Sequence, residues 1–175
     1  LLPYQPALLD LHAAFGRDAP RIVEIGFGMG HATAAIADSH RETDYLGIEV
    51  HRPGAGSLLR RIEAGSLNNV RVMLGDAKEI LEQRVADASL TAVHLFFPDP
   101  WPKKRHHKRR LVQPDFAALV AHKLKAGGYF HLATDWPAYA EHMVAVVSAT
   151  PGLVDASGEG RFQGLVAERL ATRFE

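Results

Sequence analysis

The stretch VEIGFGMGHA, residues 23–32, places three glycines at alternate positions between a short β-branched run and a helix-like stretch. Gly26, Gly28 and Gly30 allow the backbone to turn sharply and leave room for a ligand to lie against it. The N-terminus of the following helix offers N–H donors that no helical carbonyl uses. The pattern is typical of a strand-to-helix turn that binds a nucleotide-like ligand, although a tight turn without a ligand is the alternative.

Outward from this turn, β-branched runs alternate with helix-like stretches, which predicts an α/β fold with a mostly parallel sheet flanked by helices. The expected strands cover residues 21–25, 45–50, 70–74, 92–97 and 129–133, and the tail after Pro151 is expected to add two, for seven strands. The expected helices cover residues 30–39, 54–64, 78–85, 115–124 and 137–149. We expect Gly127 and Gly128 to end the fourth helix with a positive-φ cap.

The length and composition favour one soluble domain over residues 1–175. The apolar runs are shorter than the roughly 18 residues that would span a bilayer, so we expect no membrane association. The chain has no cysteine, which excludes disulfides and thiolate metal sites, and the expected location is the cytoplasm. The first residue is Leu1 rather than methionine, so we expect an N-terminal segment to precede it.

Acids near the strand ends indicate which ligand the glycines would hold. Glu49 ends the second expected strand, 19 positions after Gly30, where a carboxylate can accept hydrogen bonds from ribose hydroxyls. Asp76 follows the third strand, where it can meet the exocyclic amine of an adenine. Glu24 precedes the glycines and would repel the pyrophosphate of a dinucleotide. It would suit a cationic ligand such as S-adenosylmethionine.

A second stretch, FFPDPWPKKRHHKRR at residues 96–110, places an acid between prolines and then concentrates positive charge. Pro98 and Pro100 stiffen the loop that carries Asp99, and this loop follows the expected central strand, where open α/β sheets bind their ligands. Six cations fall in eight positions, namely Lys103, Lys104, Arg105, Lys108, Arg109 and Arg110. The rest of this net-neutral chain carries 14 basic and 20 acidic residues, so the positive field is local and would steer a polyanion to one place.

This basic stretch, together with GIEVHRPG, TDWPAYAEHM and the terminal TRFE, resembles the tRNA (guanine-N7-)-methyltransferases of bacterial type over residues 20–175. The glycine stretch resembles the cofactor half of class I S-adenosylmethionine-dependent methyltransferases. The resemblance implies a Rossmann-like fold of that class, S-adenosylmethionine as cofactor and tRNA as partner. It also implies methylation of N7 of a guanine in the tRNA variable loop, at position 46. No metal is expected, and the protein is expected to be a monomer or a homodimer.

The expected site residues follow from the residue chemistry and from this resemblance. Asp99 matches the proposed catalytic residue of the family. The expected cofactor contacts are Glu24, Gly26, Gly28, Gly30, Glu49, Asp76, Ala77 and Asp99. The expected substrate contacts are Lys103, Arg105, His106, His107, Lys108, Arg109, Arg110, Asp135, Thr172, Arg173, Phe174 and Glu175. Arg173 stands where the family usually has Lys or Asn.

Two other classes of function use fewer of these residues. A nicotinamide-dependent oxidoreductase would need only the glycines and Glu49, and a non-catalytic RNA-binding domain would need only the basic stretch. Two residue roles also stay open. Trp101 could stack on a base or pack under its loop, and Asp135 could contact the base or ribose or cap the following helix.

Overall fold

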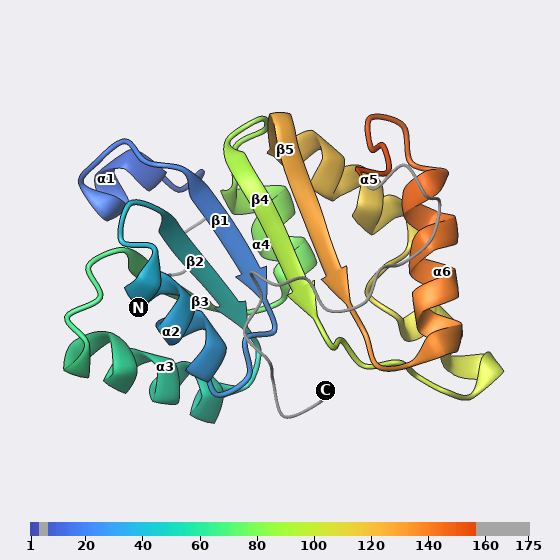
Figure 1. Cartoon of the computed structure of the whole chain (residues 1–175), viewed down its shortest axis with the longest axis horizontal. Coiled ribbons are helices and arrows are strands. Elements are labelled where there is room, and N and C mark those ends of the chain that lie inside the picture. Colours follow the sequence, from blue (N-terminus) through green and yellow to red (C-terminus); the bar gives the residue numbers. More distant parts are fainter. Residues whose placement is uncertain (4–6, 157–175) are drawn as a thin grey trace.

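The computed structural model describes residues 1–3 and 7–156, which form a parallel sheet with helices on both faces (Figure 1). Its strands are β1 (Arg21–Ile25), β2 (Asp44–Glu49), β3 (Val70–Leu74), β4 (Leu90–Phe96) and β5 (Leu124–Ala133). The order across the sheet is β3-β2-β1-β4-β5, and every neighbouring pair is parallel. The predicted α/β class is therefore confirmed.

The helices form one layer on each side of the sheet (Figure 1). They are α1 (Leu11–Phe15), α2 (His31–Ser39), α3 (Arg52–Ala64), α4 (Ala77–Arg84), α5 (Pro114–Lys123) and α6 (Pro137–Ser148), with a 3-10 helix η1 (Lys104–Arg109). Helices α2 and α3 cover one face, and α1, α4, α5 and α6 contribute to the core on the other. Both faces of β2 are buried, which explains why its sequence lacks the alternation of a half-exposed strand.

The described residues contain five strands rather than seven. The two strands expected after Pro151 fall partly on residues 151–156, which contain no strand, and otherwise on residues 157–175, outside the described part of the chain. None of the described helices is both long and apolar enough to cross a membrane.

The predicted glycine cap of the fourth long helix is wrong. Helix α5 ends at Lys123, and the chain enters β5 directly at Leu124. Gly127 does have a positive φ of 76°, but it lies inside β5, near the register shift of β5 against β4 between Leu90 and Ala92. The left-handed conformation therefore serves an irregularity of the strand rather than a helix end.

Candidate active site

Polar residues follow the strands along one edge of the sheet. Because all five strands are parallel, their carboxyl ends meet at the lower edge in Figure 1. Across this edge lie Asp76 after β3, Glu49 at the end of β2, the glycine loop (residues 26–30) after β1, Asp99 after β4 and Asp135 after β5. The connection after β1 leads to β2 on one side, and the connection after β4 leads to β5 on the other side. Ligands of open α/β sheets bind at the point where the strand order reverses in this way.

The glycine loop depends on backbone conformations that suit glycine. Gly26, Gly28 and Gly30 have φ values of 72°, 57° and 70°. The Gly28 N–H donates to Glu49 Oε2 at 2.9 Å, which joins the loop to the end of β2. Helix α3 also approaches closely, since a Cβ at Gly54 would lie 2.2 Å from the Gly28 oxygen. Gly54 was not predicted as a site residue; the only signal in the sequence is a glycine near the start of a helix.

Three backbone N–H groups fix the Glu49 carboxylate. Besides Gly28, its Oε1 accepts from the N–H groups of Val50 at 2.8 Å and His51 at 3.0 Å. The side chain is therefore oriented before any ligand arrives, and Oε2, which accepts only one of the three bonds, keeps acceptor capacity for a ribose hydroxyl. The exposed side chains of Met29 and Val50 lie next to these groups in the sequence and add apolar surface to this edge, which sequence reasoning did not predict.

Glu24 is a buried carboxyl in an environment that suits a positive ligand. Burial raises its pKa from 4.5 to about 7, and the Thr33 side chain opposes the shift in part. On the neighbouring strand β4, His94 is the residue in register with Glu24. Burial and the nearby His131 lower the pKa of His94 to about 4, so its imidazole is neutral near pH 7. Within the described part of the chain, no Lys or Arg forms an ion pair with Glu24. A cationic cofactor such as S-adenosylmethionine would supply the missing charge.

Asp76 begins α4 as its N-cap, with Oδ1 accepting the Glu79 N–H at 3.0 Å. The cap fixes the side chain at the edge, where Oδ2 can accept from an adenine amine. Ala77 follows as the first residue of α4 and is buried.

Asp99 is exposed in the proline loop, residues 98–102, after β4. On either side of it, Phe97 and Trp101 have φ values of 51° and 45°, in the left-handed region that bulky residues rarely adopt. The Phe97 N–H donates to the Ala133 oxygen of β5 at 2.8 Å. The loop that carries Asp99 is thus constrained, but the extended geometry that Pro98 predicts for the residue before it is wrong, because Phe97 is left-handed.

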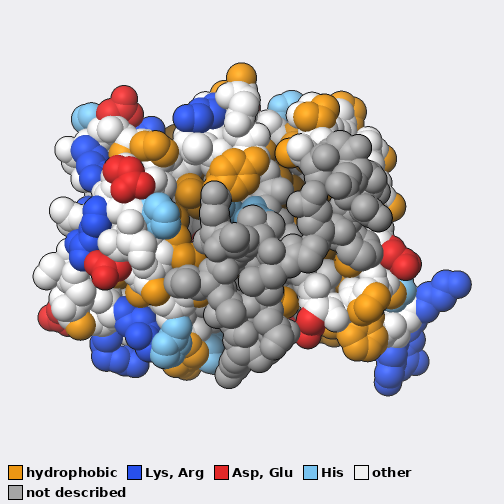
Figure 2. Space-filling view, viewed as in Figure 1, with side chains coloured by type: hydrophobic (Ala, Val, Ile, Leu, Met, Phe, Trp, Pro, Cys, Tyr) orange, Lys and Arg blue, Asp and Glu red, His pale blue; other side chains and the backbone are white. Residues whose placement is uncertain are grey.

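The basic run, residues 103–110, contains η1 and projects at the lower right in Figure 2. Its exposed cations are Lys103, Lys104, Arg105, Lys108 and Arg109. The Arg109 guanidinium lies 5.0 Å from the centre of the Trp101 ring, and the His106 ring lies 5.9 Å from it. Trp101 therefore packs against side chains of the basic run, and its stacking on a base stays a prediction. Among the described residues, no three His, Cys, Asp or Glu side chains gather to hold a metal ion.

The structure corrects what was expected of Arg110 and one alternative for Asp135, and it does not describe the terminal contacts. Arg110 is buried, with 3% of its surface exposed, and is therefore not one of the surface cations. Asp135 is exposed, and the cap alternative for it is wrong: the N-cap of α6 is Trp136, whose N–H donates to Thr134 Oγ1 at 3.2 Å. The terminal stretch 172–175 lies outside the described residues.

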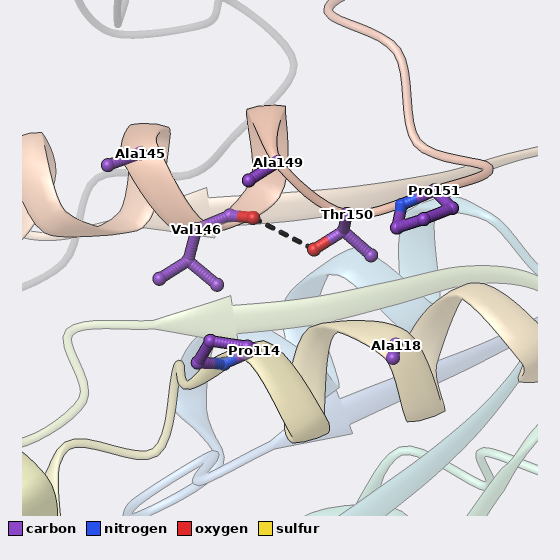
Figure 3. Close-up of a pocket in the computed structure, with 7 residues that line it drawn as sticks. All are labelled: Pro114, Ala118, Ala145, Val146, Ala149, Thr150 and Pro151. Carbon is purple, nitrogen blue, oxygen red and sulfur yellow. Dashed lines mark hydrogen bonds between the residues drawn. The ribbon is translucent and has the colours of Figure 1, made fainter.

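An apolar hollow of about 260 Å³ between α5 and α6 is separate from this edge (Figure 3). Its lining residues are Pro114, Ala118, Ala145, Val146, Ala149, Thr150 and Pro151. None of these lining residues is ionisable. The Thr150 hydroxyl already donates to the Val146 oxygen at 2.8 Å, so the hollow offers little polarity.

Comparison with solved structures supports the fold assignment. An antibiotic-related methyltransferase matches with a TM-score of 0.58 and 21% identity, over 79% of this chain and 71% of that one. A precorrin-6y C5,15-methyltransferase from Geobacter metallireducens GS-15 matches with a TM-score of 0.60 and 14% identity, over 78% and 66%. A family model described as "Putative methyltransferase" matches residues 18–175. Fold and site together define a methyltransferase of the Rossmann-like α/β class.

Curated relatives narrow this class. The tRNA (guanine-N(7)-)-methyltransferase of Alkalilimnicola ehrlichii is 59% identical over 167 residues, which cover 95% of this chain and 70% of the relative. The protein of the same name from Pseudomonas aeruginosa, strain UCBPP-PA14, is 56% identical over 166 residues, covering 95% and 68%. The chain belongs to the tRNA (guanine-N(7)-)-methyltransferase family. Membership confirms the resemblance of the motifs and decides against the oxidoreductase and the non-catalytic RNA-binding domain.

Proposed function

We propose that this protein transfers the methyl group of S-adenosylmethionine to N7 of a guanine in the variable loop of tRNA, at position 46. The observation that carries the proposal is the place of Asp99, exposed at the carboxyl edge between the glycine loop and the basic run. One edge thereby combines a cofactor site, a carboxylate for a base and a surface for phosphates. Family membership supports the same reaction.

When bound, S-adenosylmethionine supplies an electrophilic methyl group on a sulfonium. The pre-oriented Glu49 carboxylate accepts from a ribose hydroxyl through Oε2, and Asp76 with Ala77 holds the adenine end. Glu24 contributes the negative charge that faces the cationic part of the ligand. Because a cation stabilises the charged form of a carboxyl, cofactor binding lowers the pKa of Glu24 from its raised value.

Asp99 orients the base rather than removing a proton. N7 of guanine has an in-plane lone pair and no hydrogen, so methyl transfer requires alignment with the methyl carbon more than it requires a general base. A carboxylate can accept from the N1–H and the N2 amine of guanine. Adenine has neither donor, so it would leave the carboxylate oxygens without hydrogen-bond partners. Asp135, exposed after the neighbouring strand, is a second carboxylate for this base or its ribose.

The exposed cations of the basic run bind the RNA backbone. The N7 edge of a paired guanine lies in a deep and narrow groove, so the target base must be unstacked while other contacts hold the tRNA. The proposed phosphate contacts are Lys103, Arg105, Lys108 and Arg109, with His106 and His107 as additional donors. Thr172–Glu175 remain proposed substrate contacts, and we expect the enzyme to act in the cytoplasm.

The test is to incubate the protein with methyl-labelled S-adenosylmethionine and unmodified tRNA, and then to identify and map the labelled nucleoside. We expect 7-methylguanosine at one position of the variable loop. A matched tRNA with 7-deazaguanine at that position has a C–H group in place of N7 and should accept no label. Label at another atom or position, or label in the deaza tRNA, would contradict the proposal.

A further inference from the structure

Arg110 ends the basic run, but its side chain points into the protein. Its surface is 3% exposed, whereas the other five cations of the run are exposed. Nε donates to the Pro100 oxygen at 2.8 Å, and Nη1 donates to the Ala138 oxygen at 3.5 Å. The guanidinium also lies 4.7 Å from the centre of the Tyr139 ring. Arg110 thus joins the proline loop to the first turn of α6.

The proline loop needs such an outside donor. Three of its five residues are prolines without an N–H group, so only Asp99 and Trp101 carry backbone donors. Backbone hydrogen bonds hold the chain on either side of the loop, from the Phe97 N–H to the Ala133 oxygen and from the His106 N–H to the Lys103 oxygen. The bond from Arg110 reaches the middle of the loop, at the residue that follows Asp99.

Backbone strain points to the same requirement. The left-handed residues Phe97 and Trp101 enclose Asp99 on both sides. Such conformations persist in bulky residues only where the surrounding structure holds them. The Pro100 oxygen lies between the two strained positions, so its bond to Arg110 restrains the segment at the point where relaxation would move Asp99.

Arg110 is itself held firmly enough to serve as this restraint. Tyr139 beneath it is fully buried, and the Tyr139 hydroxyl accepts the Val112 N–H at 3.2 Å. The guanidinium therefore combines a ring face with two carbonyl acceptors on different elements. A lysine has the charge but neither the planar fork nor an equivalent of Nε.

We propose that Arg110 is a positioning residue for methyl transfer, which holds the proline loop so that Asp99 meets the guanine, and that it does not bind RNA phosphate. The role assigned to Asp99 rests on the proposed function. A misplacement of about 1 Å can cost about 100-fold in rate, so loss of the restraint should affect the chemical step.

Two substitutions separate hydrogen bonding from charge. Arg110→Lys keeps the charge, whereas Arg110→Gln is neutral and places an amide nitrogen the same number of bonds from Cα as Nε. At saturating tRNA and S-adenosylmethionine, we expect Arg110→Lys to lower the single-turnover rate about 10- to 100-fold and Arg110→Gln to lower it less. The slope of log K for tRNA against log salt should stay at the value of the parent in both. The reverse order of rates, or a smaller slope in Arg110→Gln, would overturn the proposal.

A stability control separates positioning from general destabilisation. Val120→Ala removes buried volume from α5, away from the proline loop, and should lower Tm without lowering the single-turnover rate well below that Tm. If Val120→Ala lowers the rate as much as an Arg110 variant of similar Tm, the effect of Arg110 is one of stability and the proposal fails.

Amide hydrogen exchange tests the restraint without RNA or cofactor. In Arg110→Lys, the hydrogen-bonded amides of Phe97 and His106, on either side of the loop, should exchange faster than in the parent, while amides of β1 and of the middle of β4 keep their protection. If Arg110→Lys does not fold, Arg110→Gln is compared with Arg110→Met. Met has no donor, so the same amides should exchange faster in Arg110→Met than in Arg110→Gln. Unchanged exchange would refute the restraint, whereas a parent that does not methylate tRNA would refute only the proposed function.

Discussion

Gly54→Ala should damage the cofactor site from outside it. The added methyl carbon would lie 2.2 Å from the Gly28 oxygen and 3.1 Å from the Gly28 carbonyl carbon. Carbon–oxygen contacts in folded proteins are rarely below 3.0 Å, so α3 and the glycine loop must separate by about 1 Å. The Gly28 N–H bond to Glu49 Oε2, now 2.9 Å, is the contact that this separation stretches.

The size of the effect follows from that bond. That bond orients the Glu49 carboxylate, and a displaced carboxylate would cost the cofactor one hydrogen bond to a charged group, about 1.5–3 kcal/mol, so S-adenosylmethionine binding should weaken by roughly 10- to 150-fold. Alanine is also more favourable than glycine within a helix, by up to about 1 kcal/mol. This gain offsets part of the loss in folding stability but does not restore cofactor binding. Gly56→Ala, two residues later in the same helix, makes the same chemical change where the nearest atom is Arg60 Nη1 at 3.9 Å.

Calorimetric titration with S-adenosylmethionine and thermal unfolding of both variants give the test. Gly56→Ala should bind as the parent does and unfold at a slightly higher temperature, whereas Gly54→Ala should bind at least tenfold more weakly. Equal cofactor affinity in the two variants would show that the approach of α3 to the glycine loop does not shape the site.

Three further predictions concern charge. The pKa of Glu24 is raised from 4.5 to about 7, so the folded protein binds a proton that the unfolded chain releases, and stability from this carboxyl falls as pH rises from 4.5 to about 7. In urea titrations, Glu24→Gln should remove this dependence and raise the free energy of unfolding above pH 7 by up to about 3 kcal/mol, and an unaltered pH profile would contradict the argument. Replacing Lys108 and Arg109 by alanine should weaken tRNA binding and reduce its slope of log K against log salt by roughly 0.7–0.9 for each phosphate that no longer meets a cation, with cofactor affinity as the control. Asp99→Asn should slow single turnover nearly as much as Asp99→Ala, because an amide donor would face guanine's donors. The rate of the parent should be flat from about pH 6.5 to 8.5, and a rise with pH that Asp99→Asn abolishes would show that Asp99 acts as a base.

The sequence predicted the sheet well because buried parallel strands are short apolar runs separated by amphipathic helices. β1 and β3 begin and end where the pattern places them, and the long helices differ by at most two residues at either end. The five-residue helix α1 was missed because it is too short to show a helical period. Gly127 shows the limit of local reasoning: its sequence indicates a need for positive φ, but only its pairing with β4 decides that a strand uses it.

The positions of the site acids were predictable for a topological reason, because parallel strands bring their carboxyl ends to one edge. The chemistry that arises where different elements pack together was not predictable from the sequence. The raised pKa of Glu24 depends on what surrounds it, and the close approach of Gly54 depends on how α3 packs. Arg110 looked like its basic neighbours because its burial depends on Tyr139, which is 29 positions further along the chain.

The pairing of β1 with β4 also orders events during synthesis on the ribosome. It aligns Ile22 with Ala92, 70 positions apart, whereas β1, β2 and β3 follow one another and can pair as they emerge. Until β4 leaves the exit tunnel, β1 has an unpaired edge with open N–H and C=O groups, the kind of edge that recruits other chains. The nascent chain therefore carries the glycine loop and Glu49 before it carries Asp99, and translation speed between β3 and β4 sets how long that edge is exposed.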